Sequence, residues 1–132
     1  MDKKAAIREY KLSSRPMGIY QIRNTTNEKI WIDSSVNLPA KFNRYRLQLN
    51  AGTHVNKDLQ ADWKDLGESA FAFEILEPLE PRDDPNYDYA ADLEVLEDLW
   101  LEKLTPYGDR GYNIPKRSTE ERLRMIRENR SM

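Results

Sequence analysis

The chain has 132 residues, among them 21 Lys or Arg, 23 Asp or Glu, one histidine and no cysteine. This length corresponds to one globular domain, and the lack of cysteine excludes a disulfide framework and a thiolate metal site. Because His54 is the lone histidine, a multi-histidine metal cluster is excluded as well. No apolar run approaches the roughly 20 residues of a membrane span, so we expect a cytoplasmic protein without a membrane partner.

Charged residues are distributed unevenly along the chain. Residues 1–60 carry 11 basic and 5 acidic side chains, residues 61–109 carry 3 and 15, and residues 110–132 carry 7 and 3. Phosphate groups bind where cations cluster, which the first and last segments could provide. The acidic middle segment would repel a nucleic-acid backbone unless it faces away from it or binds cations.

The domain is expected to run from residue 16 to residue 116, between a helical extension at residues 1–15 and a charged helix at residues 117–132. Pro16 separates the first extension from the domain, because proline cannot continue a helix. The final segment holds several arginines and few apolar residues, which is typical of a solvated helix.

Alternating side chains predict a first strand over residues 17–23, with Tyr20 and Ile22 on the same face. A turn rich in Asn and Thr leads to a second strand over residues 29–33, whose β-branched and aromatic residues suit a sheet. A third strand is predicted over residues 69–76, where phenylalanines alternate with smaller residues.

Apolar residues recur at helical spacing in three segments, over residues 38–49, 56–66 and 89–104. Gly52 and Gly67 follow the first two segments, and glycine commonly ends a helix. Together with the strands, these helices predict an α+β fold with a small, mostly antiparallel three-stranded sheet flanked by helices.

Glu97 lies in the middle of the apolar arc of the last predicted helix. On a wheel of about 100° per residue, Leu93 and Trp100 fall on one side of it and Leu101 on the other. A buried carboxylate without a partner is costly, so we expect a metal ion, a cation or sheet donors to meet it. The alternative is a structural ion pair with Lys41.

Two tripeptides stand out on the first two strands, Gly18-Ile19-Tyr20 and Trp31-Ile32-Asp33, followed by a helix. This order of strand, turn, strand and helix resembles the core of the GIY-YIG nuclease superfamily, over residues 17–114. The resemblance implies two paired antiparallel strands that carry the tripeptides, with the catalytic helix next. The first tripeptide is intact, whereas the second is altered.

The resemblance further implies a site that hydrolyses phosphodiester bonds in DNA around a single Mg²⁺ or Mn²⁺ ion. Glu97 stands at the position of the metal-binding glutamate, and Asp33 is a candidate further ligand. The residues at the other catalytic positions are Tyr20, Trp31, Lys41, Tyr45 and Asn113. The candidate nucleic-acid contacts are Arg23, Arg44, Arg46 and Lys57.

Phosphodiester cleavage needs an activated water, neutralisation of developing charge and help for the leaving oxygen, and three residues depart from the pattern that supplies them. Trp31 keeps an aromatic ring and one N–H donor but cannot take part in proton transfer as the usual tyrosine can. Asp33 replaces glycine and adds negative charge. Lys41 keeps the charge of the usual arginine without its bidentate geometry.

Two functions therefore stay open. The first is a Mg²⁺-dependent DNA endonuclease with a modified site, favoured by the residues retained at family positions. The second is a catalytically inactive module that binds nucleic acid or a protein partner, favoured by Trp31, Asp33 and the acidic middle segment. For Asp33 the alternative role is a helix or turn cap, and His54 is expected to be a solvated loop or capping residue.

Overall fold

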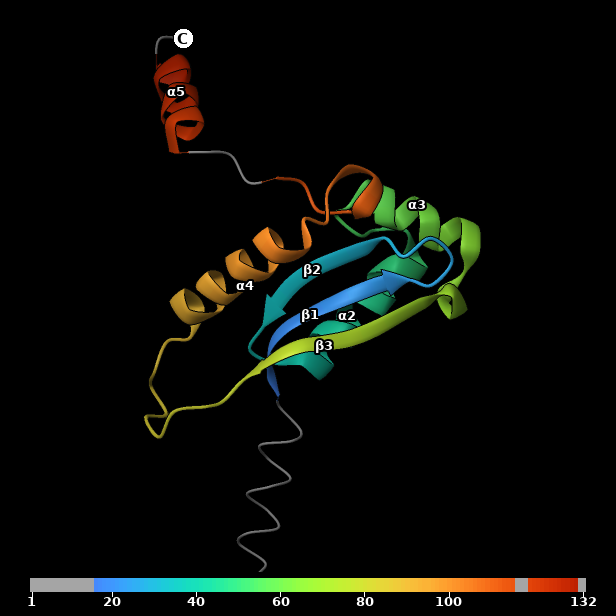
Figure 1. The fold of residues 1–132 in the computed structure, drawn as a ribbon, viewed down its shortest axis with the longest axis horizontal. Helices are drawn as coiled ribbons and strands as arrows, with labels where there is room; N and C mark the ends of the chain where they lie inside the picture. The colour runs from blue at the N-terminus through green and yellow to red at the C-terminus, as the bar shows by residue number, and fades with distance from the viewer. Residues whose placement is uncertain (1–15, 116–118, 131–132) are drawn as a thin grey trace, which may run out of the picture.

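The computed structural model describes residues 16–115 and 119–130, so the expected helical extension at residues 1–15 lies outside the described residues. An antiparallel sheet forms the centre of the molecule, with its strands in the order β2-β1-β3. The strands are β1 (Met17–Asn24), β2 (Ile30–Ser35) and β3 (Phe71–Leu79). The predicted α+β fold with a three-stranded antiparallel sheet is confirmed (Figure 1).

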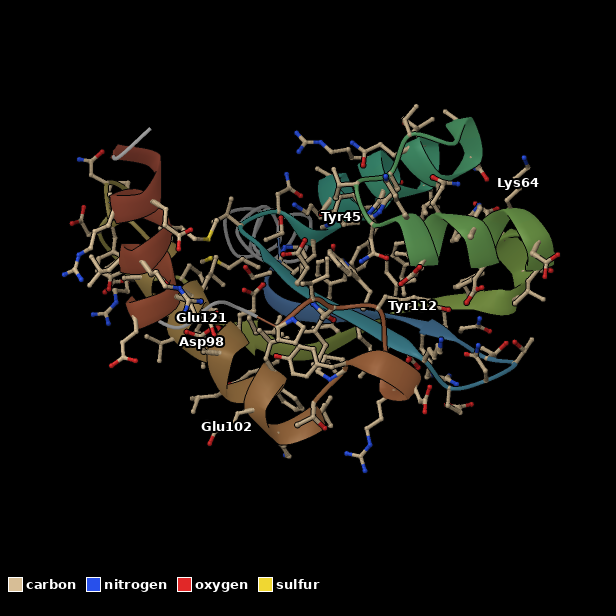
Figure 2. The ribbon with its side chains drawn as sticks, turned by 90° about the horizontal axis from the view of Figure 1, so that it is seen from above. Tyr45, Lys64, Asp98, Glu102, Tyr112 and Glu121 are labelled. Atoms are coloured by element: carbon tan, nitrogen blue, oxygen red, sulfur yellow. The ribbon has the colours of Figure 1, made fainter. Side chains whose placement is uncertain are left out.

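Helices cover both faces of the sheet. In the view of Figure 2, α2 (Leu38–Ala51) and α3 (Lys57–Leu66) lie on one side of the strands and α4 (Ala90–Leu104) lies on the other. The last described helix, α5 (Thr119–Arg130), stands away from the sheet (Figure 1). None of the helices that the structure describes has the length and apolar character needed to cross a bilayer.

Side-chain caps begin the two helices that follow the strand hairpin. Asn37 Oδ1 accepts a hydrogen bond from the backbone N–H of Ala40, and Asn56 Oδ1 accepts one from the N–H of Leu59. Both bonds satisfy amide groups that have no partner within a first helical turn. At its other end, α2 stops at Gly52 in the left-handed conformation, with φ 79°.

All three strands extend beyond their predicted ends, β1 by one residue to Asn24. β2 continues to Ser35, and β3 runs through Pro78, a residue that the sequence pattern assigns to the following loop. Proline is tolerated there because β3 is an edge strand and needs no N–H on its open side. β3 also contains an irregularity, because Ile19 pairs with Glu77 while the next residue of β1 pairs with Ile75.

The sheet separates two hydrophobic cores, as the alternation of β1 predicts. Tyr20 and Ile22 face α2 and α3, whereas Ile19 faces α4. The buried residues of the first core are Tyr20, Ile22, Leu38, Tyr45, Leu49, Leu59, Trp63 and Tyr112. Those of the second are Ile19, Ile32, Leu93 and Leu101. The motif tyrosine therefore lies on the side of the sheet that α2 covers.

Gly18 places the backbone of β1 unusually close to β3. Its φ is 148°, and a Cβ atom at this position would collide with the backbone carbonyl oxygen of Glu77. Only glycine combines that backbone conformation with the absence of a side chain. The first residue of the intact tripeptide is thus required by the pairing of the two strands that hold Tyr20 in place.

Candidate active site

Asp33 is the centre of a cluster built from three elements. It lies opposite Tyr20 in the β1–β2 register. Its Oδ2 accepts hydrogen bonds from the hydroxyl of Tyr45 at 2.8 Å and from that of Tyr20 at 3.3 Å. Lys41 Nζ, one turn before Tyr45 on α2, lies 3.5 Å from the same oxygen. Cross-strand pairing and the helical i, i+4 spacing together produce this convergence.

This arrangement replaces the expected capping role of Asp33. The N-cap of α2 is Asn37, and the only cap-like bond of Asp33 is accepted by Oδ1 from the adjacent N–H of Ser34 at 2.8 Å. The carboxylate instead faces the motif tyrosine. Lys41 carries the ion pair with Asp33, and its ammonium also lies 4.8 Å from the centre of the Tyr45 ring.

The two phenols of the cluster are held in their neutral form. Burial, followed by the nearby Asp33 carboxylate, raises the pKa of the Tyr20 hydroxyl far above its usual range. The same two causes, in the same order, raise the pKa of Tyr45. Both hydroxyls are therefore hydrogen-bond donors at neutral pH, and neither is a phenolate base.

His54 is buried beside this cluster, which corrects the expectation of a solvated loop residue. Only 6% of it is exposed, and its ring packs edge-on against Tyr45 at 4.6 Å and Trp31 at 5.7 Å between ring centres. Its Nδ1 accepts a hydrogen bond from the backbone N–H of Asn56 at 3.0 Å. Burial lowers the pKa of the imidazole, so the neutral ring carries its proton on Nε2.

Two donors next to the cluster have no acceptor within the part of the chain that the structure describes. They are the buried Nε1 of Trp31 and the buried Nε2 of His54. Buried polar atoms are normally hydrogen-bonded, so such a pair needs an explanation. Two N–H groups that point to no protein acceptor provide the chemistry for an oxyanion such as a phosphate oxygen.

Comparison with known proteins decides the family. No protein-family model matches the chain. Intron-associated endonuclease 1 of Enterobacteria phage T4 is 32% identical over 98 residues, which are 74% of this chain and 36% of that protein. The chain therefore spans about a third of the length of the curated relative that it matches.

The fold matches two solved structures of the catalytic domain of the intron endonuclease I-TevI. A glutamate-to-alanine mutant of that domain superposes with a TM-score of 0.64 at 28% identity, over 78% of this chain and 97% of the other. A second structure has a TM-score of 0.62 at 29% identity, over 76% and 99%. This chain belongs to the GIY-YIG nuclease superfamily.

In this GIY-YIG domain, Glu97 lies on α4, which packs against β2 and β1 from the opposite face to α2. Its neighbours one turn away in either direction, Leu93 and Leu101, are buried, and Glu97 itself is half-buried. The predicted position of Glu97 within the sheet-facing arc is confirmed. The structure brings Tyr20, Asp33, Lys41 and Tyr45 together on the α2 side, with Glu97 on the helix that packs on the other side of β2.

Among these residues, Glu97 is the candidate ligand for a single Mg²⁺ ion. Within the described ranges, no group of three or more His, Asp or Glu side chains could hold a metal ion by itself. Mg²⁺ is commonly bound by one or two carboxylates, with phosphate and water completing its octahedral shell. Glu97 carries a carboxylate of this kind. The Asp33 carboxylate accepts hydrogen bonds from two phenols and lies near Lys41.

Asn113 holds the outer edge of β2 rather than facing the cluster. Its Oδ1 accepts a hydrogen bond from the N–H of Ile32 at 2.8 Å, and its Nδ2 donates one to the carbonyl of Ile32 at 2.9 Å. Ile32 lies between Trp31 and Asp33. The geometry therefore makes Asn113 a positioning residue that fixes the altered tripeptide, and both ends of its amide are engaged.

The four candidate nucleic-acid contacts do not form one surface. Arg23 lies on the α4 side of β1, where its guanidinium bonds Glu74 at 2.8 Å and Glu28 at 3.3 Å. Arg44, Arg46 and Lys57 belong to the helices on the Tyr20 side. Arg46 stacks over the ring of Phe73 at 4.5 Å, and the other two are exposed. A phosphate would have to compete with two carboxylates for Arg23.

Proposed function

We propose that this chain is a divalent-metal-dependent endonuclease that hydrolyses phosphodiester bonds in DNA. The observation that carries the proposal is the convergence of the hydroxyls of Tyr20 and Tyr45 and the ammonium of Lys41 on one anionic oxygen, Asp33 Oδ2. Similarity to an intron-associated endonuclease and to the catalytic domain of an intron endonuclease supports it.

Each residue has a role that follows from its chemistry. Lys41 neutralises charge on the phosphate, as a point charge rather than a bidentate clamp. The hydroxyls of Tyr20 and Tyr45 donate hydrogen bonds to phosphate or leaving oxygens, because both stay protonated. The N–H groups of Trp31 and His54 provide two further donors.

Glu97 would hold the Mg²⁺ or Mn²⁺ ion. Such an ion supplies Lewis-acid polarisation of the phosphate and lowers the pKa of a bound water. Asn113 acts through the backbone of Ile32 and keeps Trp31 and Asp33 in register. In this assignment the domain spans residues 16–116, and the segments on either side of it are extensions that do not contribute to the chemistry.

A plasmid nicking assay tests the proposal. The wild-type protein should convert supercoiled DNA to open circles with Mg²⁺ or Mn²⁺ and not with a chelator. Glu97→Ala should slow nicking by about 100-fold or more, because several kcal/mol of transition-state stabilisation depends on the metal. The matched control is Glu94→Ala, which removes an exposed glutamate from the same helix and should cut normally. Equal nicking by both variants would remove Glu97 from the site.

The second candidate function is a non-catalytic module that binds DNA or a protein partner. It is favoured by Asp33, whose carboxylate occupies the donors that a phosphate would need. The same assay separates the two functions. If wild-type protein retains duplex DNA in a binding assay but nicks none of it with either metal, the non-catalytic function is the correct one.

A further inference from the structure

The Asp33 carboxylate has the position and the partners of a bound anion. One of its oxygens receives two phenol hydroxyls and lies 3.5 Å from an ammonium. These donors come from β1 and α2, while Asp33 itself comes from β2. Lys41 and Asp33 have similar, low side-chain exposures of 22% and 21%. The pair therefore neutralises itself in a partly desolvated place.

The same donors are those that a phosphodiester oxygen requires. Carboxylate and phosphate oxygens are both anionic acceptors that bind hydroxyls and ammonium groups through charge-assisted hydrogen bonds. A phosphate that approaches Lys41 must therefore replace Asp33 or meet its negative charge. The resident carboxylate competes for every donor of the cluster.

Two unsatisfied donors are buried beside this cluster. Trp31 Nε1 and His54 Nε2 are buried donors without an acceptor among the described residues. The His54 ring contacts Tyr45, which donates to Asp33, so the two sets of donors are neighbours. An anion that contacts Lys41 would gain that contact only at the expense of Asp33.

We propose that Asp33 is an internal competitor for DNA phosphate at this site. A phosphodiester binds by displacing the Asp33 carboxylate from Lys41, Tyr20 and Tyr45. The inference rests on the proposed function and deepens it, because it names the group that limits substrate affinity. It follows that Lys41 contributes little to DNA affinity until the charge of Asp33 is removed.

The test is equilibrium binding of a short labelled duplex, measured by fluorescence anisotropy in a chelator so that no DNA is cut. Asp33→Asn should bind about tenfold more tightly than the wild type, the equivalent of one freed charge-assisted contact. The slope of log affinity against log salt should steepen by about 0.9, because one more phosphate is neutralised. Asp33→Gly, which removes the side chain altogether, should behave in the same way.

Asp92→Asn is the matched control. Asp92 also accepts a tyrosine hydroxyl, from Tyr87 at 3.0 Å, and lies 4.0 Å from an arginine, Arg82. The substitution removes the same charge and the same kind of bond at another place. If it tightens binding as much as Asp33→Asn does, net charge explains the gain and the proposal is overturned.

Lys41→Gln completes the experiment. It should change the affinity less than about twofold in the wild type and about tenfold in the Asp33→Asn background. Equal losses in both backgrounds would overturn the proposal. If wild-type protein nicks DNA but neither Asp33 variant binds more tightly, the competitor role fails while the nuclease function stands. If no variant nicks DNA but Asp33→Asn binds more tightly, the hydrolysis fails while the competitor role stands.

Discussion

At the scale of single residues, burial and one carboxylate decide the protonation of the cluster. Both causes raise the pKa values of Tyr20 and Tyr45, whereas burial lowers that of His54. All three side chains are neutral at pH 7 and can donate hydrogen bonds. In the proposed function, the charge that meets a phosphate therefore comes from Lys41, and Asp33 opposes it.

Because the pKa of His54 is lowered in the folded protein, the free energy of unfolding should decrease as the pH becomes acidic. In the unfolded chain, His54 becomes protonated as the pH falls below its ordinary pKa of about 6.5. In the folded chain, burial disfavours this protonation. The stability from the neutral ring is therefore present above pH 6.5 and is lost as the pH falls through the folded-state pKa. In urea titrations, the wild type should lose about 1 kcal/mol more than His54→Asn between about pH 7.5 and 5.5.

Asparagine is chosen because its side-chain oxygen can replace Nδ1 as the acceptor for the N–H of Asn56. The two proteins are compared at the same temperature and salt. If their unfolding free energies fall equally with pH, His54 does not titrate differently in the folded state and the proposed neutral Nε2 donor is wrong.

Gly18 offers a second test at this scale. Gly18→Ala should cost about 3 kcal/mol or more in urea unfolding, because a Cβ would strike the Glu77 carbonyl at an unfavourable φ. Gly52→Ala is the matched control, since its φ is also positive and nothing lies within 4 Å of the new atom. That variant should cost only about 1 kcal/mol. Equal costs would mean that the close approach of β1 and β3 is absent.

At the scale of elements, the segment after α4 secures the edge of β2. The N–H of Tyr112 donates to the carbonyl of Ile30 at 2.8 Å, and Asn113 bonds both backbone groups of Ile32. Tyr112 is itself anchored, because its hydroxyl donates to Asp62 on α3 at 2.7 Å and accepts from Asn24 at 3.0 Å. Figure 2 places its ring between α3 and the sheet. The altered tripeptide is thus fixed from both sides of its strand.

Asn113→Ala should loosen this edge without unfolding the domain. Loss of two hydrogen bonds to a strand predicts a destabilisation of about 1–3 kcal/mol. Hydrogen exchange of the Ile32 amide should accelerate, and nicking should slow because Trp31 and Asp33 lose their register. The control is Asn86→Ala in the exposed loop before α4. Unchanged protection at Ile32 in the Asn113 variant would show that β2 is held by β1 alone.

At the scale of the whole molecule, the two cores and the sheet between them form the unit that carries the site. α5 stands away from this unit (Figure 1), and its apolar residues Leu123 and Ile126 are 46% and 49% exposed. A helix that buries little apolar surface contributes little to the cooperative stability of the domain. The structure therefore predicts that the layers around the sheet fold without the last helix.

Truncation after Lys116 tests this prediction. The melting temperature should change by less than about 2 °C, because little buried apolar surface is removed. Leu101→Ala, in the core under α4, is the positive control and should destabilise by about 2–5 kcal/mol. A truncated protein that melts as early as the Leu101 variant would show that α5 packs on the domain.

Local patterns alone were sufficient for much of the framework. Alternation along β1 predicted that Tyr20 and Ile22 share a face, and the spacing on α4 predicted that Glu97 lies in the sheet-facing arc. These properties depend on neighbours within a few residues, so a repeat of two or 3.6 residues carries them. The tripeptides and the helix that follows also sufficed to indicate the family, which the relatives confirm.

Tertiary structure decided which residues of the candidate site contact one another. Asp33 meets Tyr20 and Tyr45 across 13 and 12 residues of sequence, and Asn113 meets Ile32 across 81. His54 is buried because the turn between α2 and α3 folds its ring against Trp31 and Tyr45. Such contacts depend on strand register and helix packing, which no local pattern records. The sequence by itself therefore determined which residues share a face, and the tertiary structure determined that a carboxylate stands among the hydroxyl and ammonium donors of the candidate site.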